Sequence, residues 1–205
     1  GEEMVMEKLR YAFVNSEKLR RHVSYLFNRG SMYRTCNGNL LYHGCVPLEE
    51  DGSFKKVQVG NEWFSGRALF EELESWARKG YYLADGDEKR FGQDTMWFMW
   101  ANENSPLYGK ERMTTFERYF VKDTSCYYEA KNSYYSYLND DSVISAILTE
   151  FGLDPASPAS HIINGHMPVH LKSGETPIKC GGRLLMIDGG MSRPYQRETG
   201  IAGYT

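Results

Sequence analysis

The sequence predicts a mixed α/β fold in a single domain over residues 1–205. Segments with the 3.6-residue period of amphipathic helices occur beside short apolar runs typical of strands. Strong turn signals such as Asn37-Gly38 separate several of these segments. A chain of 205 residues is long enough to bury about 70% of its unfolded surface, so a substantial hydrophobic core is expected.

In the first eighty residues, the pattern predicts two helices and two hairpins. Ser16 is a candidate N-cap for the first helix, and Gly30 is expected to end it. Asn37-Gly38 and Gly60-Asn61 are the expected hairpin turns. The expected elements are helices at 16–27 and 67–80 and strands at 32–36, 39–43, 53–59 and 62–64.

The second part of the chain is expected to contain more loops. The charged segment 84–90 reads as a solvated loop, and the apolar run 96–100 is expected to be buried. Asp140 or Asp141 is a suitable cap for a further helix, which Gly152 would end. The remaining elements are predicted as strands at 115–121, 161–163 and 184–187 and a helix at 140–151.

Composition excludes several classes of protein. Lysine and arginine number 24 against 27 acidic residues, which gives a net charge of −3, and no long basic run favours nucleic-acid binding. No apolar stretch has the length of a membrane span, and no signal peptide opens the sequence. The 4 cysteines are widely spaced, which argues against a zinc ribbon or a disulfide framework. We therefore expect a protein of the reducing cytoplasm, without membrane or nucleic-acid partners.

Two predicted strands end in the same way, with a histidine beside a glycine. One is Leu40-Leu41-Tyr42-His43-Gly44, and the other is Ile162-Ile163-Asn164-Gly165-His166. Ligands collect beyond the carboxyl ends of strands in open sheets, and glycine lets a backbone turn sharply there. Neutral imidazole suits manganese, iron and zinc, so the two loops are candidates to meet on one ion. The alternative, a structural histidine at each turn, stays open from the spacing alone.

Three longer stretches carry a family resemblance. They are HGCVPLEEDGSF at 43–54, SPLYGKERMTTFERYF at 105–120 and INGHMPVHLKSGETPIKCGGRLLMIDGGMSRPYQRETGIAGYT at 163–205. From about residue 20 to its end, the sequence resembles the class III fructose-1,6-bisphosphatases of bacteria, which are similar to calcineurin-like metallophosphoesterases. The resemblance implies a partial β-sandwich flanked by helices and a dinuclear metal centre, usually with Mn²⁺. It also implies a cytoplasmic gluconeogenic enzyme that removes the 1-phosphate of fructose 1,6-bisphosphate.

The resemblance assigns His43 and His166 as ligands of the same metal ion. Asn164 and Gly165 belong to the turn that carries His166 and are expected to set its shape. His170 lies four residues after His166, so it does not match the second histidine of a G-H-x-H motif.

The family's other metal motifs are D-x-H, G-D-x-x-D-R-G and G-N-H-D, and this sequence contains none of them. A two-metal phosphatase needs a bridging carboxylate and further ligands. The resemblance therefore implies a carboxyl-terminal portion that carries part of a dinuclear site. Such a chain is expected to be inactive alone and to need the missing amino-terminal half as its partner.

Substrate binding is the less defined side of the prediction. A bisphosphate requires cations, and the candidates within the family-like stretches are Lys110, Arg112, Arg118 and Arg193. Each has the alternative of an ordinary surface cation, which is the commoner role of such residues. Asp188 follows a predicted strand, and capping of the next turn is favoured for it over support of a ligand histidine. Cys45 is expected to be a small buried packing group.

A function of another class competes with the enzyme. The chain is also readable as a non-catalytic sugar-phosphate-binding or oligomerisation module derived from the same family. Its 14% aromatic content would serve such an interface. In either case we expect a homo-oligomer, because a partial sandwich exposes sheet edges and apolar surface.

Overall fold

The computed structural model describes residues 1–190 and 193–204. Within it, the chain forms two compact units, Gly1–Ser31 and Met32–Thr205. The single domain expected over residues 1–205 stays a prediction.

The first unit consists of two helices, α1 (Glu2–Val14) and α2 (Glu17–Arg29). Ser16 is the N-cap of α2, since its hydroxyl accepts a hydrogen bond of 3.3 Å from the Leu19 amide. At the other end, the Gly30 amide donates to the Leu26 carbonyl at 2.7 Å. The predicted helix and both of its boundary signals are confirmed, whereas the sequence pattern did not reveal α1.

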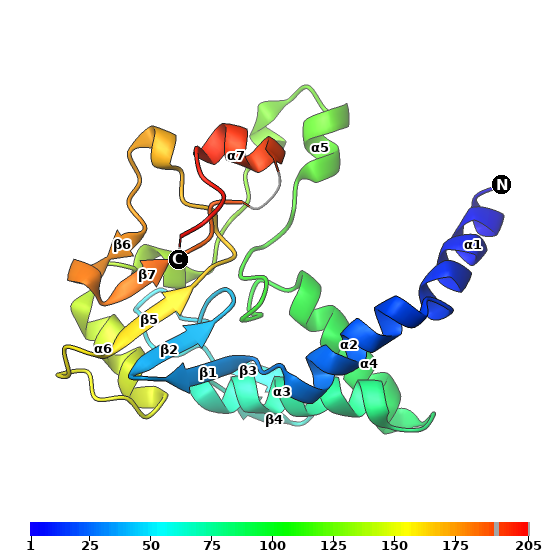
Figure 1. The fold of residues 1–205 in the computed structure, drawn as a ribbon, viewed down its shortest axis with the longest axis horizontal. Helices are drawn as coiled ribbons and strands as arrows, with labels where there is room; N and C mark the ends of the chain where they lie inside the picture. The colour runs from blue at the N-terminus through cyan, green and yellow to red at the C-terminus, as the bar shows by residue number, and fades with distance from the viewer. Residues whose placement is uncertain (191–192, 205) are drawn as a thin grey trace. The chain divides into compact units, whose positions relative to one another are not determined.

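The second unit combines a five-stranded sheet, a two-stranded sheet and five α-helices in its described part (Figure 1). The strands are β1 (Tyr33–Cys36), β2 (Asn39–Tyr42), β3 (Val57–Val59), β4 (Glu62–Phe64), β5 (His161–Asn164), β6 (Ile178–Lys179) and β7 (Leu184–Met186). The helices are α3 (Gly66–Tyr82), α4 (Asp87–Ala101), α5 (Thr115–Phe120), α6 (Asp141–Glu150) and α7 (Arg193–Thr199). Short 3-10 helices occupy Thr124–Tyr127, Ser133–Ser136, Leu171–Ser173 and Cys180–Gly182. The mixed α/β class predicted from the sequence is confirmed.

The larger sheet has the strand order β1-β2-β5-β7-β6. Its three central strands, β2, β5 and β7, are parallel, and an antiparallel strand flanks them on each side. Both predicted hairpins are present, β1–β2 and β3–β4. Asn37 and Gly38 have φ values of 51° and 81°, as the tight turn between β1 and β2 requires.

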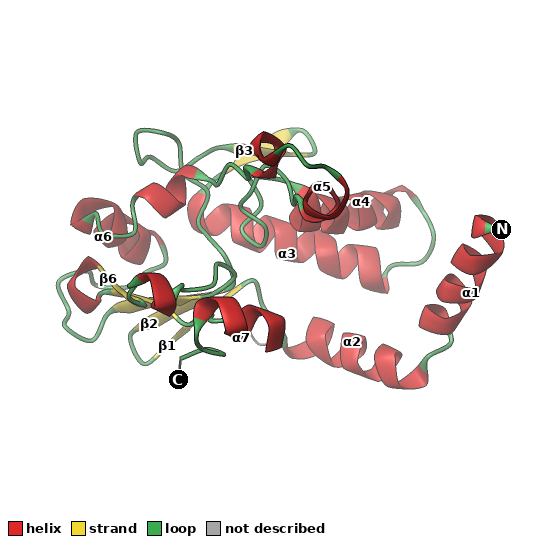
Figure 2. Ribbon diagram, turned by 90° about the horizontal axis from the view of Figure 1, so that it is seen from above, coloured by secondary structure: helices red, strands yellow, loops and turns green. Residues whose placement is uncertain are grey.

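The register of the central strands places their apolar residues in one row. Leu40 of β2 pairs with Ile162 of β5, which pairs with Leu184 of β7. All three side chains are fully buried. They share a core cluster with Phe70 of α3 and Ile147 of α6, and Figure 2 shows both helices on the same side of the sheet. Because the strands are parallel and in register, their carboxyl ends meet at one edge of the sheet.

Helices α3 and α4 lie side by side (Figures 1 and 2). They touch at two buried glycines, Gly80 and Gly92. A Cβ added at Gly80 would lie 2.6 Å from the carbonyl carbon of Gly92, and one added at Gly92 would overlap the backbone of Trp76 and Gly80. Only glycine permits this approach of the two backbones.

Two predictions around α4 are wrong. The charged segment is a loop only as far as Gly86, because Asp87 and Glu88 form the first turn of α4, where negative side chains favour a helix. The apolar run that follows is not uniformly buried. Met99 is buried, but Trp97 and Trp100 are 66% and 69% exposed because they lie on the other face of the helix.

The prediction of a strand at 115–121 is also wrong, since residues 115–120 form helix α5. Aromatic residues favour strands in general, but here they follow a helical period, and the rings of Phe116 and Phe120 stack with centroids 6.5 Å apart. By contrast, the helix predicted at 140–151 is present as α6. The Asp140 carboxylate caps it by accepting from the amides of Ser142 and Val143.

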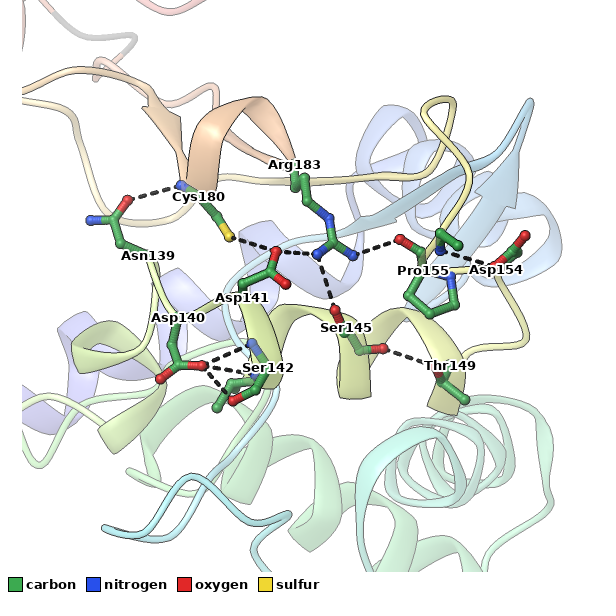
Figure 3. A network of polar contacts seen from close by, with 12 residues as sticks. Asn139, Asp140, Asp141, Ser142, Ser145, Thr149, Asp154, Pro155, Cys180 and Arg183 are labelled. Atoms are coloured by element: carbon green, nitrogen blue, oxygen red, sulfur yellow. Dashed lines mark hydrogen bonds and ion pairs between the residues drawn. The ribbon is translucent and has the colours of Figure 1, made fainter.

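Arg183, just before β7, connects the sheet to α6 (Figure 3). Its guanidinium donates to the Asp141 carboxylate, to the Ser145 hydroxyl at 3.0 Å and to the Pro155 carbonyl at 3.0 Å. Three acceptors from two segments are thus satisfied by one planar group. This network fixes α6 against the edge of the sheet from which β7 starts.

Within the described residues, no helix combines the length and apolar character needed to cross a membrane. The 4 cysteines of this chain are all free thiols.

Candidate metal centre

His43 and His166 meet at the carboxyl ends of neighbouring strands. His43 follows β2 directly, and His166 lies two residues after β5. Nε2 of His43 and Nδ1 of His166 share a hydrogen bond of 3.1 Å, and the ring centroids are 4.9 Å apart. The parallel pairing of β2 with β5 is what brings these distant residues together. The two loops therefore meet as the sequence pattern suggested, and binding of a metal ion there stays a prediction.

The backbone around the pair is tightly constrained. The Gly165 amide donates to the His43 carbonyl at 2.8 Å, so one histidine turn is bonded directly to the other. His166 has a φ of 66°, in the left-handed region that is uncommon for any residue but glycine. Such a conformation persists only where the surroundings enforce it, and it is frequent at functional sites.

Both imidazoles favour the neutral state. Desolvation lowers the pKa of His43, and the nearby charge of Asp188 opposes this only in part. Desolvation, the neighbouring His43 and the charge of Lys110 together lower the pKa of His166 to about 4. Neutral imidazole is the form that binds metal ions. In the metal-free pair one facing nitrogen carries the shared proton, so binding of both nitrogens to one ion would require that proton to move to the other nitrogen of its ring.

Asp188 lies at the end of the third parallel strand, after β7. Its Oδ1 accepts a hydrogen bond of 2.8 Å from the Gly190 amide, as expected for a residue that caps the following turn. Its charge also raises the pKa of both histidines, so the carboxylate faces their side of the sheet edge. The turn cap favoured from the sequence is present, and support of a ligand histidine by Asp188 stays a prediction.

The spacing of the two nitrogens fits ligands of one ion. Imidazole nitrogens bind zinc at about 2.0–2.1 Å, so two of them on adjacent positions around an ion lie about 3.0–3.4 Å apart. The observed separation is 3.1 Å. A full set is not present, because the described residues contain no group of three or more histidine, cysteine, aspartate or glutamate side chains that could hold a metal. The pair fits part of a metal site.

One atom of the pair still lacks a partner. Nε2 of His166 is buried, and no group in the part of the chain described here completes a hydrogen bond with it. The backbone of Tyr108 approaches the ring closely enough to raise its pKa slightly. Histidines that bind metal through one nitrogen usually donate from the other, so the Tyr108 backbone is a candidate acceptor.

A model of the family described as Firmicute fructose-1,6-bisphosphatase matches residues 1–205. The chain is 52% identical over 205 residues to a Clostridium acetobutylicum protein named fructose-1,6-bisphosphatase class 3, covering 100% of this chain and 30% of the relative. Relatives of the same name from Clostridium novyi and Clostridium botulinum are also 52% identical, over 206 and 202 residues. The matches cover 100% and 98% of this chain and 31% and 30% of those relatives.

The chain belongs to this family. It spans about 30% of the length of the curated relatives that it matches. No solved structure matched it.

Lys110, one of the four cations predicted from the sequence to bind substrate, acts electrostatically on His166 of the histidine pair. Its charge contributes to the lowered pKa of His166. Its Nζ forms an ion pair of 3.1 Å with Glu129, in which both side chains are largely buried. Glu129 also accepts from the amide and the hydroxyl of Thr114, at 2.9 Å each. The sequence pattern missed Glu129 and Tyr108, because both lie in irregular segments without any periodicity.

The three arginine candidates are placed differently. Arg118 donates to the Thr114 hydroxyl at 3.0 Å and to the Tyr127 carbonyl at 3.2 Å, which joins it to the network around Glu129. Arg112 is exposed and pairs with its neighbour Glu111 at 3.7 Å. Arg193 is exposed at the start of α7. Substrate binding by all four cations stays a prediction.

Three further residues, His170, His161 and Cys45, have contacts or positions that suit a structural role. The His170 amide donates to Glu175, and His161 begins β5 at the opposite end from the pair. Cys45 is fully buried, and burial raises the pKa of its thiol to about 12, which leaves it a packing group at neutral pH.

Proposed function

We propose that this chain is part of a fructose-1,6-bisphosphatase that hydrolyses fructose 1,6-bisphosphate to fructose 6-phosphate and phosphate. The observation that carries the proposal is the pair of neutral imidazoles, 3.1 Å apart at the ends of parallel strands. Support comes from the family match over residues 1–205 and from relatives named for this activity.

In this proposal, His43 and His166 hold one ion of a dinuclear Mn²⁺ centre. Mn²⁺ prefers more numerous and harder oxygen ligands than two imidazoles provide, so carboxylates from a further segment of the family polypeptide complete the site. When bound, such a centre would supply an activated water and would stabilise charge on the phosphoryl group. The chain's own contribution is to present two desolvated, uncharged nitrogen donors in a fixed relative position.

Lys110 is the proposed phosphate-binding cation of this chain. It lies within electrostatic range of His166, and Glu129 fixes its ammonium group at 3.1 Å. A lysine held beside a metal pair can stabilise the negative charge that develops during phosphoryl transfer. Arg118, Arg112 and Arg193 are proposed to bind the more distant phosphate.

The cellular setting is part of the same proposal. We propose a cytoplasmic, gluconeogenic enzyme, in which this chain works together with an amino-terminal segment of the family. Composition supports this setting, since the net charge is only −3 and the cysteines show no disulfide pattern.

A chimera tests the proposed function directly. In the Clostridium acetobutylicum relative, the matching 30% of the protein would be replaced by this chain, which covers it completely at 52% identity. We expect Mn²⁺-dependent release of phosphate from fructose 1,6-bisphosphate. His43→Ala and His166→Ala should each abolish that release, whereas His161→Ala, at the start of β5, should retain it. Activity that survives both histidine substitutions would overturn the proposed ligands.

The isolated chain, assayed beside the chimera, provides a second test. Without further carboxylates, we expect no turnover with added Mn²⁺ and less than one tightly bound ion per chain. Turnover by the isolated chain that is lost in both His43→Ala and His166→Ala would instead mean that it builds a complete site by itself.

Exposed aromatic side chains favour a second candidate function, association with another copy of this chain. Trp97 and Trp100 on α4 and Phe116 and Tyr119 on α5 are all more than 60% exposed. Aromatic residues are enriched at protein interfaces. A monomer in light scattering at high concentration, for the isolated chain and the chimera alike, would count against self-association.

A further inference from the structure

Asn164, the last residue of β5, lies at the junction of the three parallel strand ends. Its backbone carbonyl accepts a hydrogen bond of 2.9 Å from Ile187, which follows β7. Its side-chain amide donates to the carbonyl of Gly44, which follows His43, at 2.7 Å. One buried residue therefore bonds to the segments that carry His43 and Asp188, and it precedes the turn of His166.

A buried tyrosine pair fixes the orientation of this amide. The second donor contact of Asn164 Nδ2 is the Tyr134 hydroxyl at 3.2 Å, and that hydroxyl shares a hydrogen bond of 2.7 Å with Tyr42. Oδ1 of Asn164 is buried and has no partner among the described residues. The side chain of Asn164 therefore makes its contacts through the two N–H groups of its amide. An inverted amide would place its oxygen against the Gly44 carbonyl.

The contact with Gly44 acts on the position of His43. The His43 carbonyl accepts from the Gly165 amide, and the next carbonyl accepts from Asn164. Two consecutive carbonyls of one histidine turn are therefore bound by two consecutive residues of the other. This double connection leaves the His43 backbone little freedom to move relative to His166. A buried carbonyl without its donor is destabilising, so the turn would move to find another partner.

We propose that Asn164 is a positioning residue that sets the distance between the imidazoles of His43 and His166 through the Gly44 carbonyl. The importance of this distance for metal binding rests on the proposed function. The positioning itself concerns this chain alone and is measurable without metal.

Two near-isosteric substitutions separate positioning from general stability. Asn164→Asp keeps the shape of the side chain but removes both N–H donors. Tyr134→Phe removes the hydroxyl contact and leaves the bond to Gly44 intact. Both should lower the melting temperature. The readout of positioning is the nuclear Overhauser effect between ring protons of His43 and His166 in the metal-free chain, since the ring centroids are 4.9 Å apart.

We expect these ring-to-ring signals to be lost in Asn164→Asp and retained in Tyr134→Phe. Affinity for Co²⁺, used as a spectroscopic probe, should fall about tenfold or more in Asn164→Asp only, as for other residues that orient metal ligands. Unchanged ring signals in Asn164→Asp, or equal losses in both variants, would overturn the positioning role.

Two controls keep the result decisive. If Asn164→Asp does not fold, Asn164→Ser, which also lacks the amide but introduces no charge, takes its place under the same criteria. If the unmodified chain shows the ring signals but binds no Co²⁺, the Co²⁺ comparison is made in the chimera. Absence of Co²⁺ binding by the unmodified chimera would count against the metal ligands, while the positioning role is still decided by the ring signals.

Discussion

Nε2 of His43 lies 3.1 Å from Nδ1 of His166, although the two residues are 123 positions apart in the sequence. Each ring follows a different strand, so the local structure of neither segment brings the two rings together. The contact depends on the parallel pairing of β2 with β5 and on the bonds between the two turns. A ligand that needs both nitrogens is therefore sensitive to either side chain.

The two histidines are predicted to act as a unit. His43→Ala, His166→Ala and the double variant should lose Co²⁺ binding to the same extent, because one shared ion requires both nitrogens. A titration followed by visible absorption measures this, with His161→Ala as a control that retains the binding. Partial losses that add up in the double variant would show two independent sites.

Glu129→Gln is predicted to destabilise the chain in a pH-dependent way. Burial raises the pKa of Glu129, but hydrogen bonds from Thr114 and Lys110 outweigh it and leave the pKa below the ordinary value of 4.5. The ionised carboxylate therefore stabilises the fold above pH 4.5, and this contribution is lost as the pH falls through the folded-state pKa. We expect a loss of about 1–2 kcal/mol at pH 7.

Urea denaturation at several pH values checks this prediction. The difference between Glu129→Gln and the unmodified chain should shrink as the pH falls from 4.5 through the folded-state pKa, below which both carry an uncharged side chain. Glu111→Gln, at the exposed position next to Lys110, should have little effect at any pH. A difference that stays constant across the range would rule out the ionised carboxylate as its source.

Arg183→Lys is predicted to destabilise the fold by about 1–2 kcal/mol, because an ammonium cannot bridge acceptors as widely placed as those of Asp141, Ser145 and Pro155. Arg67→Lys is the matched control, since Arg67 forms an exposed ion pair with Glu71 within α3. Thermal unfolding should separate the two variants. Equal melting temperatures would mean that the Arg183 network (Figure 3) contributes no more than a surface pair.

Gly92→Ala is predicted to destabilise the pairing of α3 with α4. The added methyl group would overlap the backbone of Trp76 and Gly80, and such overpacking costs about 1–3 kcal/mol. The gain in helix propensity, about 1 kcal/mol, offsets only part of this. Gln93→Ala, at the next and exposed position, should be neutral or slightly stabilising in the same denaturation measurement. A more stable Gly92→Ala variant would contradict the close approach of the helices.

Much of the fold follows from local sequence signals. Ser16 and Asp140 mark helix starts through their side-chain caps, and Asn37-Gly38 marks a hairpin through its backbone preference. The errors arose where these local signals were ambiguous. Aromatic residues at 115–121 suit either a strand or a helix. Acidic residues at 87–88 suit either a loop or the first turn of a helix, and the structure has the helix.

The candidate site was only partly predictable, because it depends on contacts between segments that are distant in the sequence. His43 and His166 each carry a local signal, a glycine beside a histidine at a strand end. Asn164, Tyr108 and Glu129 act through partners that are distant in the sequence, and no local pattern indicates which segments become neighbours. The pairing of β2 with β5 supplies that information, and it exists only in the folded chain.

The bond between Asn164 and Gly44 joins positions 120 apart in the sequence, and helices α3, α4 and α6 all form in the segment between them. Long-range pairings of this kind slow folding, because the intervening chain must be closed into a loop first. The two nitrogen donors therefore do not exist as a pair in the unfolded chain. An ion held between them would act as a reversible cross-link across this loop, and its removal would loosen the sheet as well as the site.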